Sequence, residues 1–292
     1  MTSQTPSVLV NAHNHNAENP LWHQQHGLVY WTDIPNGRLF RYDPTPKNAA
    51  KDYEQIYTGE PVGGFTIQAD GSLLLLKTNG TVETWREGKV TSVVEEIAEV
   101  KGTRFNDAIA DPEGRVFSGT MAKDNIKGRL YRIDPDGSIQ EILQGLLVPN
   151  GMGFSLDYRY FYLTDSDQHA IFRFDYDRAT GHISNQQSLI KIPTDKGVPD
   201  GMTVDSEGYI WSARWNGSAV YRYSPEGQEV LRIDLPTPKV SCVAFGGADY
   251  HQLLISTARE GQAIAKDNEA GELFHLRVAF TGQPELLSRI GL

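Results

Sequence analysis

Short apolar runs separated by polar turns recur along the whole chain, and a similar opening precedes each pair of runs. The clearest example spans residues 198–212, where Asp200-Gly201 leads into one apolar run and a turn separates it from a second. Such openings occur at six positions: Glu18, Gly63, Asn106, Asn150, Asp200 and Ser241. Their spacing is about 44 residues, and a period of about 20–50 residues indicates a repeat array.

A second pattern follows each opening. Apolar and polar residues alternate at residues 38–42, 129–133 and 219–223, and such alternation predicts strands with one buried face. Each unit also contains a third strand after an Asp-Pro or Asp-Gly turn and a weaker fourth, whereas no segment sustains a helical period. Units of about four antiparallel strands at this period are typical of propeller blades. We therefore predict an all-β fold, a six-bladed β-propeller.

The six units occupy the whole chain, which leaves no room for a linker or a second domain. We expect a single domain, residues 1–292. The part that follows Ser241 is long enough only for the inner strands of the last blade. We expect Ser7-Val8-Leu9-Val10 to supply its outer strand and to close the ring, because this pairing removes an open sheet edge.

The six openings carry two carboxylates, two amides, one hydroxyl and one glycine. In a propeller the innermost strand of each blade lines the central channel, so the openings should meet at one mouth of that channel. Oxygen donors gathered from distant points suit a hard divalent cation such as calcium. Taken alone, Asn150-Gly151 is also an ordinary turn dipeptide. The coincidence of donors at one repeat position favours a metal site.

Composition narrows the choice of partner and compartment. The formal net charge is −10, which argues against a nucleic-acid partner because phosphate binding needs clustered Lys and Arg. No apolar stretch approaches the length of a membrane span, and residues 1–16 lack the apolar core of a signal peptide. We expect no membrane association and a cytoplasmic location. Cys242 is the single cysteine, so an internal disulfide and a thiolate metal cluster are excluded.

Other sequence motifs give weaker indications of a functional site. Asp165-Ser166-Asp167 resembles the start of an EF-hand loop, but Ala170 and Tyr176 stand where the required Gly and Glu would be. We interpret it as a solvated turn. The histidines have no zinc spacing, and no Gly-x-Ser-x-Gly elbow or phosphate-binding loop is present. A serine hydrolase is therefore not supported.

Four motifs, in this order, resemble the gluconolactonase, regucalcin (senescence marker protein) and luciferin-regenerating-enzyme family of six-bladed propellers. They lie at residues 17–22, at residues 103–107 with their continuation to 121, at residues 149–152 and at residues 199–202. The resemblance covers nearly the whole chain. It implies that Glu18, Asn150 and Asp200 are the metal ligands and that Asp200 is also the catalytic acid/base.

The resemblance further implies that Arg104 and Asn106 bind substrate. In an extended segment residues i and i+2 project to the same side, so both side chains can face the cavity. Two positions depart from the family. Ala108 replaces a frequent Gly, and Asp124 is the nearest match to a glutamate that contacts substrate in some members. The shorter Asp124 side chain leaves the sugar preference open.

These residues suggest a metal-dependent hydrolase that opens a sugar-acid lactone by attack of a metal-activated water. One divalent ion is implied: calcium is favoured, and zinc, manganese, magnesium or iron(II) are alternatives; no other cofactor is expected. Two alternatives are a promiscuous esterase or phosphotriesterase-like hydrolase and a non-catalytic calcium-binding propeller. Arg104 and Asn106 favour catalysis, because a calcium store needs no substrate-binding donors. The sequence leaves the oligomeric state open.

Overall fold

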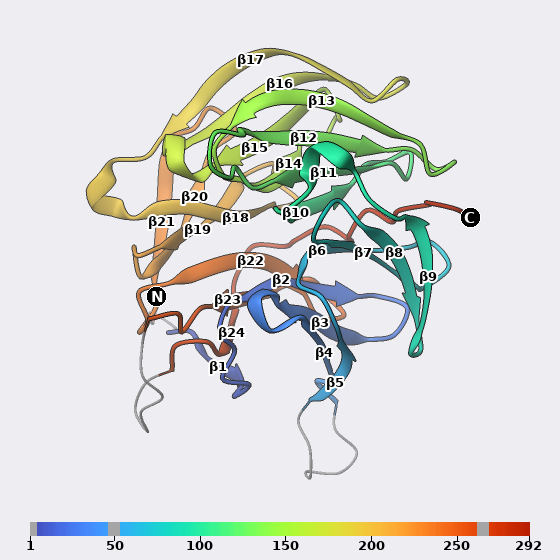
Figure 1. The fold of residues 1–292 in the computed structure, drawn as a ribbon. Coiled ribbons are helices and arrows are strands. Elements are labelled where there is room, and N and C mark those ends of the chain that lie inside the picture. The colour runs from blue at the N-terminus through green and yellow to red at the C-terminus, as the bar shows by residue number, and fades with distance from the viewer. Residues whose placement is uncertain (1–4, 46–52, 262–268) are drawn as a thin grey trace. The chain divides into compact units, whose positions relative to one another are not determined.

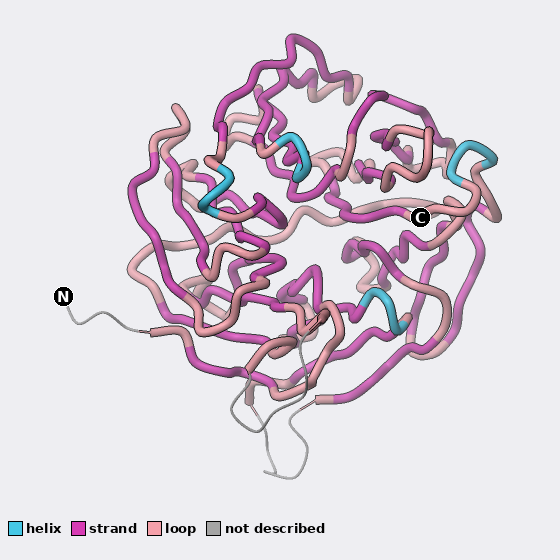
Figure 2. Tube along the Cα trace, turned by 60° about the vertical axis from the view of Figure 1, so that its left-hand side comes forward, coloured by secondary structure: helices cyan, strands magenta, loops and turns pink. Residues whose placement is uncertain are grey.

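The computed structural model describes residues 5–45, 53–261 and 269–292. Strands and turns dominate these residues, which contain no α-helix and four single-turn 3₁₀ helices (Figure 2). None of these helices has the length and apolar character needed to cross a membrane. The strands form six four-stranded antiparallel sheets, which are the blades of a six-bladed β-propeller (Figure 1). The predicted fold class is confirmed.

Three blades belong to a compact unit, unit 1, that comprises Met1–Gly59 and Ile192–Pro284. The first blade contains β2 (Ala17–His23), β3 (Leu28–Asp33), β4 (Arg38–Tyr42) and β5 (Glu54–Thr58). The second contains β18 (Val198–Val204), β19 (Ile210–Trp215), β20 (Ala219–Tyr223) and β21 (Glu229–Asp234). The third contains β22 (Val240–Gly246), β23 (Gln252–Thr257), β24 (Leu273–Arg277) and β1 (Ser7–Val10). The 3₁₀ helices of this unit are η1 (Ile34–Asn36) and η4 (Thr194–Lys196).

The other three blades belong to unit 2, which comprises Glu60–Lys191 and Glu285–Leu292. Its first blade contains β6 (Val62–Ile67), β7 (Leu73–Lys77), β8 (Val82–Arg86) and β9 (Lys89–Val94). The next contains β10 (Phe105–Ala110), β11 (Val116–Thr120), β12 (Gly128–Ile133) and β13 (Ile139–Leu146). The last contains β14 (Pro149–Phe154), β15 (Tyr160–Asp165), β16 (Ala170–Asp177) and β17 (His182–Lys191). The 3₁₀ helices of this unit are η2 (Ala98–Val100) and η3 (Ser166–Gln168).

The first strand of each blade is its innermost strand. In unit 1, β22 lies beside both β2 and β18, and in unit 2, β10 lies beside both β6 and β14. Strands β6, β14 and β22 are buried along their whole length, whereas most residues of β9 and β21 are exposed. The inner strands are therefore buried on both faces, whereas the outer strands are largely exposed.

The sheet β1-β24-β23-β22 joins the N-terminal strand to three strands from the other end of unit 1. Ser7 pairs with His275, and Val8 pairs with Phe274. The buried Glu272 carboxylate accepts a hydrogen bond from the His13 backbone N–H at 3.0 Å, just beyond β1. The sheet therefore has no unpaired edge at β24. The single-domain organisation over residues 1–292 stays a prediction.

Aromatic side chains fill the space between neighbouring blades within each unit. In unit 1, Trp211 of β19 meets Phe245 of β22 edge to face, with ring centroids 5.6 Å apart. In unit 2, Phe117 of β11 packs on Phe154 and Phe161 of the next blade. Each such ring buries a large apolar surface, and the edge-to-face geometry adds to that gain. This packing holds the inner strands in place.

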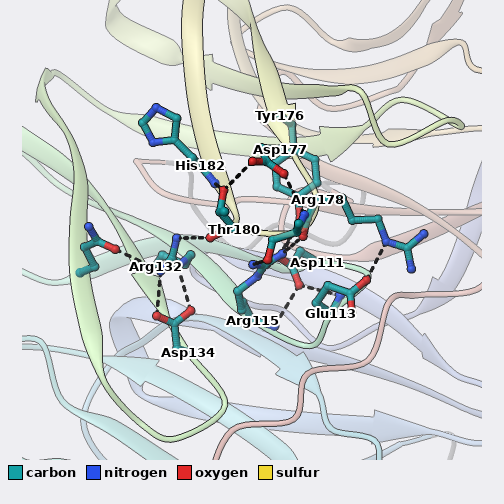
Figure 3. Close-up of polar contacts among 12 residues, drawn as sticks. Asp111, Glu113, Arg115, Arg132, Asp134, Tyr176, Asp177, Arg178, Thr180 and His182 are labelled. Atoms are coloured by element: carbon teal, nitrogen blue, oxygen red, sulfur yellow. Dashed lines mark hydrogen bonds and ion pairs between the residues drawn. The ribbon is translucent and has the colours of Figure 1, made fainter.

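A buried polar network in unit 2 ties the turn after β10 to the β16–β17 hairpin (Figure 3). Arg115 Nε donates to Asp111 Oδ2 at 2.5 Å, and the Tyr176 hydroxyl donates to the same oxygen at 2.8 Å. Arg115 Nη2 also donates to the backbone carbonyl of Arg178 at 2.5 Å. Burial raises the pKa of Tyr176, so this phenol stays a hydrogen-bond donor. The hydrogen bonds that this ion pair makes with the hairpin therefore connect two segments that are far apart in sequence.

The C-terminal segment of unit 2 returns to its first blade. The hydroxyls of Ser288 and Thr66 lie 2.8 Å apart, and Ser288 Oγ donates to the Ile67 carbonyl at 3.2 Å. The backbone N–H of Ile290 donates to Gln68 Oε1 at 2.8 Å. The end of the chain is thus part of the packed structure.

Glu285, at the start of this segment, should make stability depend on pH. Glu285 is half-buried, and the loss of solvation raises its pKa from 4.5 to about 7. The folded state therefore favours the protonated acid, and this stabilisation is complete below pH 4.5 and is lost as the pH rises to about 7. Glu285→Gln keeps the side chain neutral. It should raise the thermal midpoint at pH 8 and leave it nearly unchanged at pH 4.5; equal shifts at both would refute this.

Candidate functional site

All six predicted openings lie where the ladder between the first and second strands of a blade is irregular. In unit 1 the shifts in register fall between Glu18 and Leu21, between Pro199 and Met202, and between Val240 and Cys242. In unit 2 they fall between Val62 and Gly64, between Phe105 and Asp107, and between Pro149 and Met152. A β-bulge redirects a side chain and is common beside active sites. The repeat thus has a special backbone geometry at the predicted positions.

In unit 1, β22 lies between the strands that carry Glu18 and Asp200. Both carboxylates are buried, with 9% and 5% of the residue surface exposed. Ser241 Oγ donates to the carbonyl of Ala17 at 2.6 Å, immediately before Glu18. A Cβ on Gly201 would lie 2.4 Å from Cys242 Sγ, so this position after Asp200 requires glycine. Strand β22 therefore holds the backbone next to both predicted metal ligands.

In unit 2, Gly63 occupies the opening that carries no donor. A Cβ at this position would lie only 1.8 Å from the carbonyl oxygen of Phe105 on the neighbouring inner strand. Such a contact is impossible without moving one of the two backbones. Close approach of β6 and β10 explains why this repeat has glycine here.

Arg104 and Asn106 are in contact. Arg104 Nη1 donates to Asn106 Oδ1 at 2.7 Å and to the carbonyl of Phe105 at 2.9 Å. Asn106 Nδ2 donates to the carbonyl of Pro149 at 3.0 Å. Both polar atoms of the Asn106 amide thus have protein partners. Asn106 orients the Arg104 guanidinium and ties it to the residue that precedes Asn150.

Asn150 is buried, with 7% of its surface exposed, and its amide has a defined partner. Asn150 Nδ2 donates to Ser166 Oγ at 3.3 Å. Ser166 follows Asp165, which is fully buried and accepts hydrogen bonds from the backbone N–H groups of Leu147 at 2.9 Å and Val148 at 3.0 Å. Residues 165–167 do enter a turn in which Asp167 is exposed, but the prediction that the turn is solvated is wrong for Asp165 and Ser166, which are buried. The polar sequence Asp-Ser-Asp gives no sign that its first carboxylate is buried and accepts hydrogen bonds from backbone N–H groups.

A buried cation lies in the strand next to Asp200. Arg214 pairs with Pro199 across the β18–β19 ladder and is fully buried. Its Nη1 donates to Ser212 Oγ at 2.5 Å, and its Nη2 donates to the hydroxyl of Tyr223 at 2.6 Å. Burial lowers the pKa of Arg214, because desolvation disfavours the charged form. Sequence reasoning missed this residue, since a single arginine in a strand carries no signal of burial.

Asp124 lies at the tip of an exposed turn between β11 and β12, with a φ of 52°. An isolated bridge joins Lys123 to Ile126 across this turn. Lys123 Nζ donates to the carbonyl of Gly102 at 2.6 Å, which attaches the turn to the segment that precedes Arg104. A role for Asp124 in binding substrate stays a prediction.

The three predicted metal ligands include two acidic side chains. In the described part of the chain, no group of three or more His, Cys, Asp or Glu residues could hold a metal ion. The predicted ligand set of Glu18, Asn150 and Asp200 combines one amide oxygen with two carboxylates. This combination of oxygen donors fits a hard cation, and the hydrogen bond from Asn150 Nδ2 orients its amide.

Comparison with known proteins identifies the family. The family model described as "SMP-30/Gluconolactonase/LRE-like region" matches residues 16–259, a range that includes all six openings. The chain belongs to the SMP-30/gluconolactonase/LRE-like family. The resemblance seen in the four sequence motifs is thereby confirmed.

This SMP-30/gluconolactonase/LRE-like chain is similar along most of its length to two relatives and to one solved structure. It is 44% identical over 282 residues to pentonolactonase XacC of Haloferax volcanii, covering 94% of this chain and 95% of the relative. It is 34% identical to regucalcin of Danio rerio, with 94% of each chain covered. The structure of a calcium-binding protein, regucalcin, from Agrobacterium tumefaciens is 25% identical, has a TM-score of 0.88 and shares 98% of each chain.

Proposed function

We propose that this chain hydrolyses lactones of sugar acids, with aldono-1,4- or 1,5-lactones as the favoured substrates. The observation that carries the proposal is the 44% identity to a pentonolactonase over nearly the full length of both chains. Buried oxygen donors at the bulges of three inner strands support it. The Arg104 guanidinium, held by Asn106, supplies the donors that a polyhydroxylated substrate needs.

Glu18, Asn150 and Asp200 would hold one divalent cation. Calcium is favoured because the donors are all oxygen and because a solved relative is described as calcium-binding. Zinc, manganese, magnesium and iron(II) are the alternatives. When bound, the cation would polarise a lactone carbonyl and lower the pKa of a water molecule.

The remaining steps belong to this chain's own residues. Asp200 would accept the proton of the attacking water and return it to the ring oxygen that leaves. The hydrogen bond from Ser241 Oγ to the carbonyl of Ala17 would hold the backbone beside Glu18. The close packing of Cys242 against Gly201 would do the same beside Asp200. Arg104 would bind substrate hydroxyl groups while Asn106 keeps its guanidinium oriented.

Arg104→Ala should lower kcat/KM for a polyhydroxylated lactone by roughly tenfold to a hundredfold, because a desolvated hydrogen-bond donor is lost. The same change should have little effect on a small lactone without hydroxyl groups, which never used those donors. Steady-state kinetics on both substrates measure the difference. Equal losses on the two would mean that Arg104 supports the site without binding the sugar.

The proposed function is tested with a panel of aldonolactones and metal-stripped protein. Calcium, zinc, manganese, magnesium and iron(II) are restored one at a time, and ring opening is followed by the acid released. Turnover of a sugar lactone with at least one metal supports the proposal. Absence of turnover of every lactone with every metal would overturn it.

A second candidate function is calcium binding without catalysis. The similarity to the solved structure described as a calcium-binding protein, at 25% identity and a TM-score of 0.88, favours it. Under this alternative the chain would bind calcium, and neither it nor its Arg104→Ala variant would turn over any lactone. An esterase or phosphotriesterase-like hydrolase would instead turn over simple aryl esters or phosphotriesters faster than any lactone.

A further inference from the structure

Two turns in the molecule share one architecture. In unit 1, Asp33 ends β3 and accepts hydrogen bonds from the backbone N–H groups of His15 at 3.2 Å and Asn16 at 3.0 Å. In unit 2, Asp165 ends β15 and accepts from the corresponding groups of Leu147 and Val148. Each aspartate thus holds the chain just before an inner-strand opening.

The agreement extends to the residues that follow each aspartate. Asn36 Nδ2 donates to Asp33 Oδ2 at 2.8 Å, and Gln168 Nε2 donates to Asp165 Oδ2 at 2.6 Å. Each turn is a single 3₁₀ turn that ends in a left-handed residue. The two turns therefore share one hydrogen-bond pattern, which occurs once before Glu18 and once before Asn150.

The first residue of each turn makes the same backbone contact with a different side chain. The N–H of Ile34 donates to the carbonyl of Asn16 at 3.1 Å, and the N–H of Ser166 donates to the carbonyl of Val148 at 2.9 Å. The Ile34 side chain has no polar atom. Ser166 Oγ, in contrast, accepts a hydrogen bond from Asn150 Nδ2.

This difference matches the chemistry of the side chain beside each turn. Glu18 is a carboxylate with two equivalent oxygens, so either can face a cation. Asn150 has one oxygen and one NH₂ group, and the NH₂ group cannot bind a cation. An amide ligand must therefore be oriented, and a hydrogen bond to its NH₂ group does so. The turn beside the amide of Asn150 therefore has a hydroxyl at this position. The turn beside the carboxylate of Glu18 has an aliphatic side chain there.

We infer that Ser166 is a positioning residue that selects the orientation of the Asn150 amide in which Oδ1 faces the divalent cation. The inference rests on the proposed metal site. Ser166 acts through Asn150 and is not itself a ligand. The Asp165 carboxylate, which holds the backbone N–H groups of Leu147 and Val148, keeps this segment in place.

The test is a double-mutant cycle on calcium binding, measured by calorimetry on the full chain without substrate. Ser166→Ala should weaken calcium binding by roughly tenfold, since loss of a hydrogen-bond partner of a metal ligand typically costs about 10–100-fold in affinity. Asn150→Asp provides two equivalent oxygens and no longer needs orientation. In that background Ser166→Ala should change calcium affinity by less than about twofold.

Two controls separate orientation from turn stability. Ser166→Thr keeps the hydroxyl and should restore most of the affinity. Ser288→Ala removes another buried, hydrogen-bonded hydroxyl of unit 2, which contacts Thr66 Oγ1 and the Ile67 carbonyl, and should lower the thermal midpoint without changing calcium affinity.

Two results would overturn the inference. One is an equal loss from Ser166→Ala with Asn and with Asp at position 150, which would mean that the hydroxyl only stabilises the turn. The other is no loss in either background. Asn150→Ala distinguishes a failure of the proposed function: unchanged calcium affinity in that variant removes Asn150 from the metal site altogether.

Discussion

Asp200→Ala should lower kcat/KM for lactone hydrolysis by about a thousandfold or more and should also weaken calcium binding. The carboxylate is proposed both to hold the cation and to move the proton, and loss of general acid/base catalysis alone costs about 10²–10⁴-fold. The side chain is buried, so water cannot easily take over its role. Steady-state kinetics and calcium calorimetry on the same preparation measure the two effects.

A matched control lies in the same blade. Asp234 at the end of β21 is exposed and bonded to Arg232 at 2.7 Å, so Asp234→Ala should change neither quantity. Asp165→Ala is not a neutral control, because Asp165 holds two backbone N–H groups before Asn150. Native calcium affinity in Asp200→Ala would remove Asp200 from the ligand set.

Asp111→Ala should destabilise the protein by about 3–5 kcal/mol, because it leaves the buried guanidinium of Arg115 without its carboxylate. The Tyr176 hydroxyl would lose its acceptor at the same time. In a chain of this size such a loss lowers the thermal midpoint by roughly 10 °C. Urea unfolding and calorimetry measure it.

Asp157→Ala provides the comparison. Asp157 follows the next inner strand and pairs with Arg159, but both side chains are largely exposed, so its loss should cost less than about 1 kcal/mol. A destabilisation by Asp111→Ala no larger than that of Asp157→Ala would show that the network in Figure 3 does not hold the two segments together.

The blade architecture could be predicted because its signals are local. Alternation at residues 129–133 marks β12, and the apolar run that includes Trp211 marks β19, without reference to any other part of the chain. Six repeats of these patterns restrict the fold to a propeller, since each blade buries its faces against similar neighbours. The outer position of Ser7–Val10 in the last sheet likewise followed from counting strands.

The candidate site could be predicted in part for the same reason. Glu18, Asn150 and Asp200 occupy one repeat position, and that position is bulged in every blade. Sequence spacing could not reveal which backbone groups hold these residues. The bond from Ser241 Oγ to Ala17 joins residues 224 apart in sequence, and the bond from Asn106 Nδ2 to Pro149 joins residues 43 apart.

The repeat, the strand pattern and the positions of the oxygen donors follow from the amino-acid sequence, because each depends on the order of residues within one blade. Which polar residues are buried depends on the folded arrangement of the blades. The sequence indicates a solvated turn at Asp165 and carries no signal of burial at Arg214, yet both residues are fully buried. Burial depends on which distant backbone and hydroxyl groups can satisfy a charge, and those partners are brought close only when the chain folds.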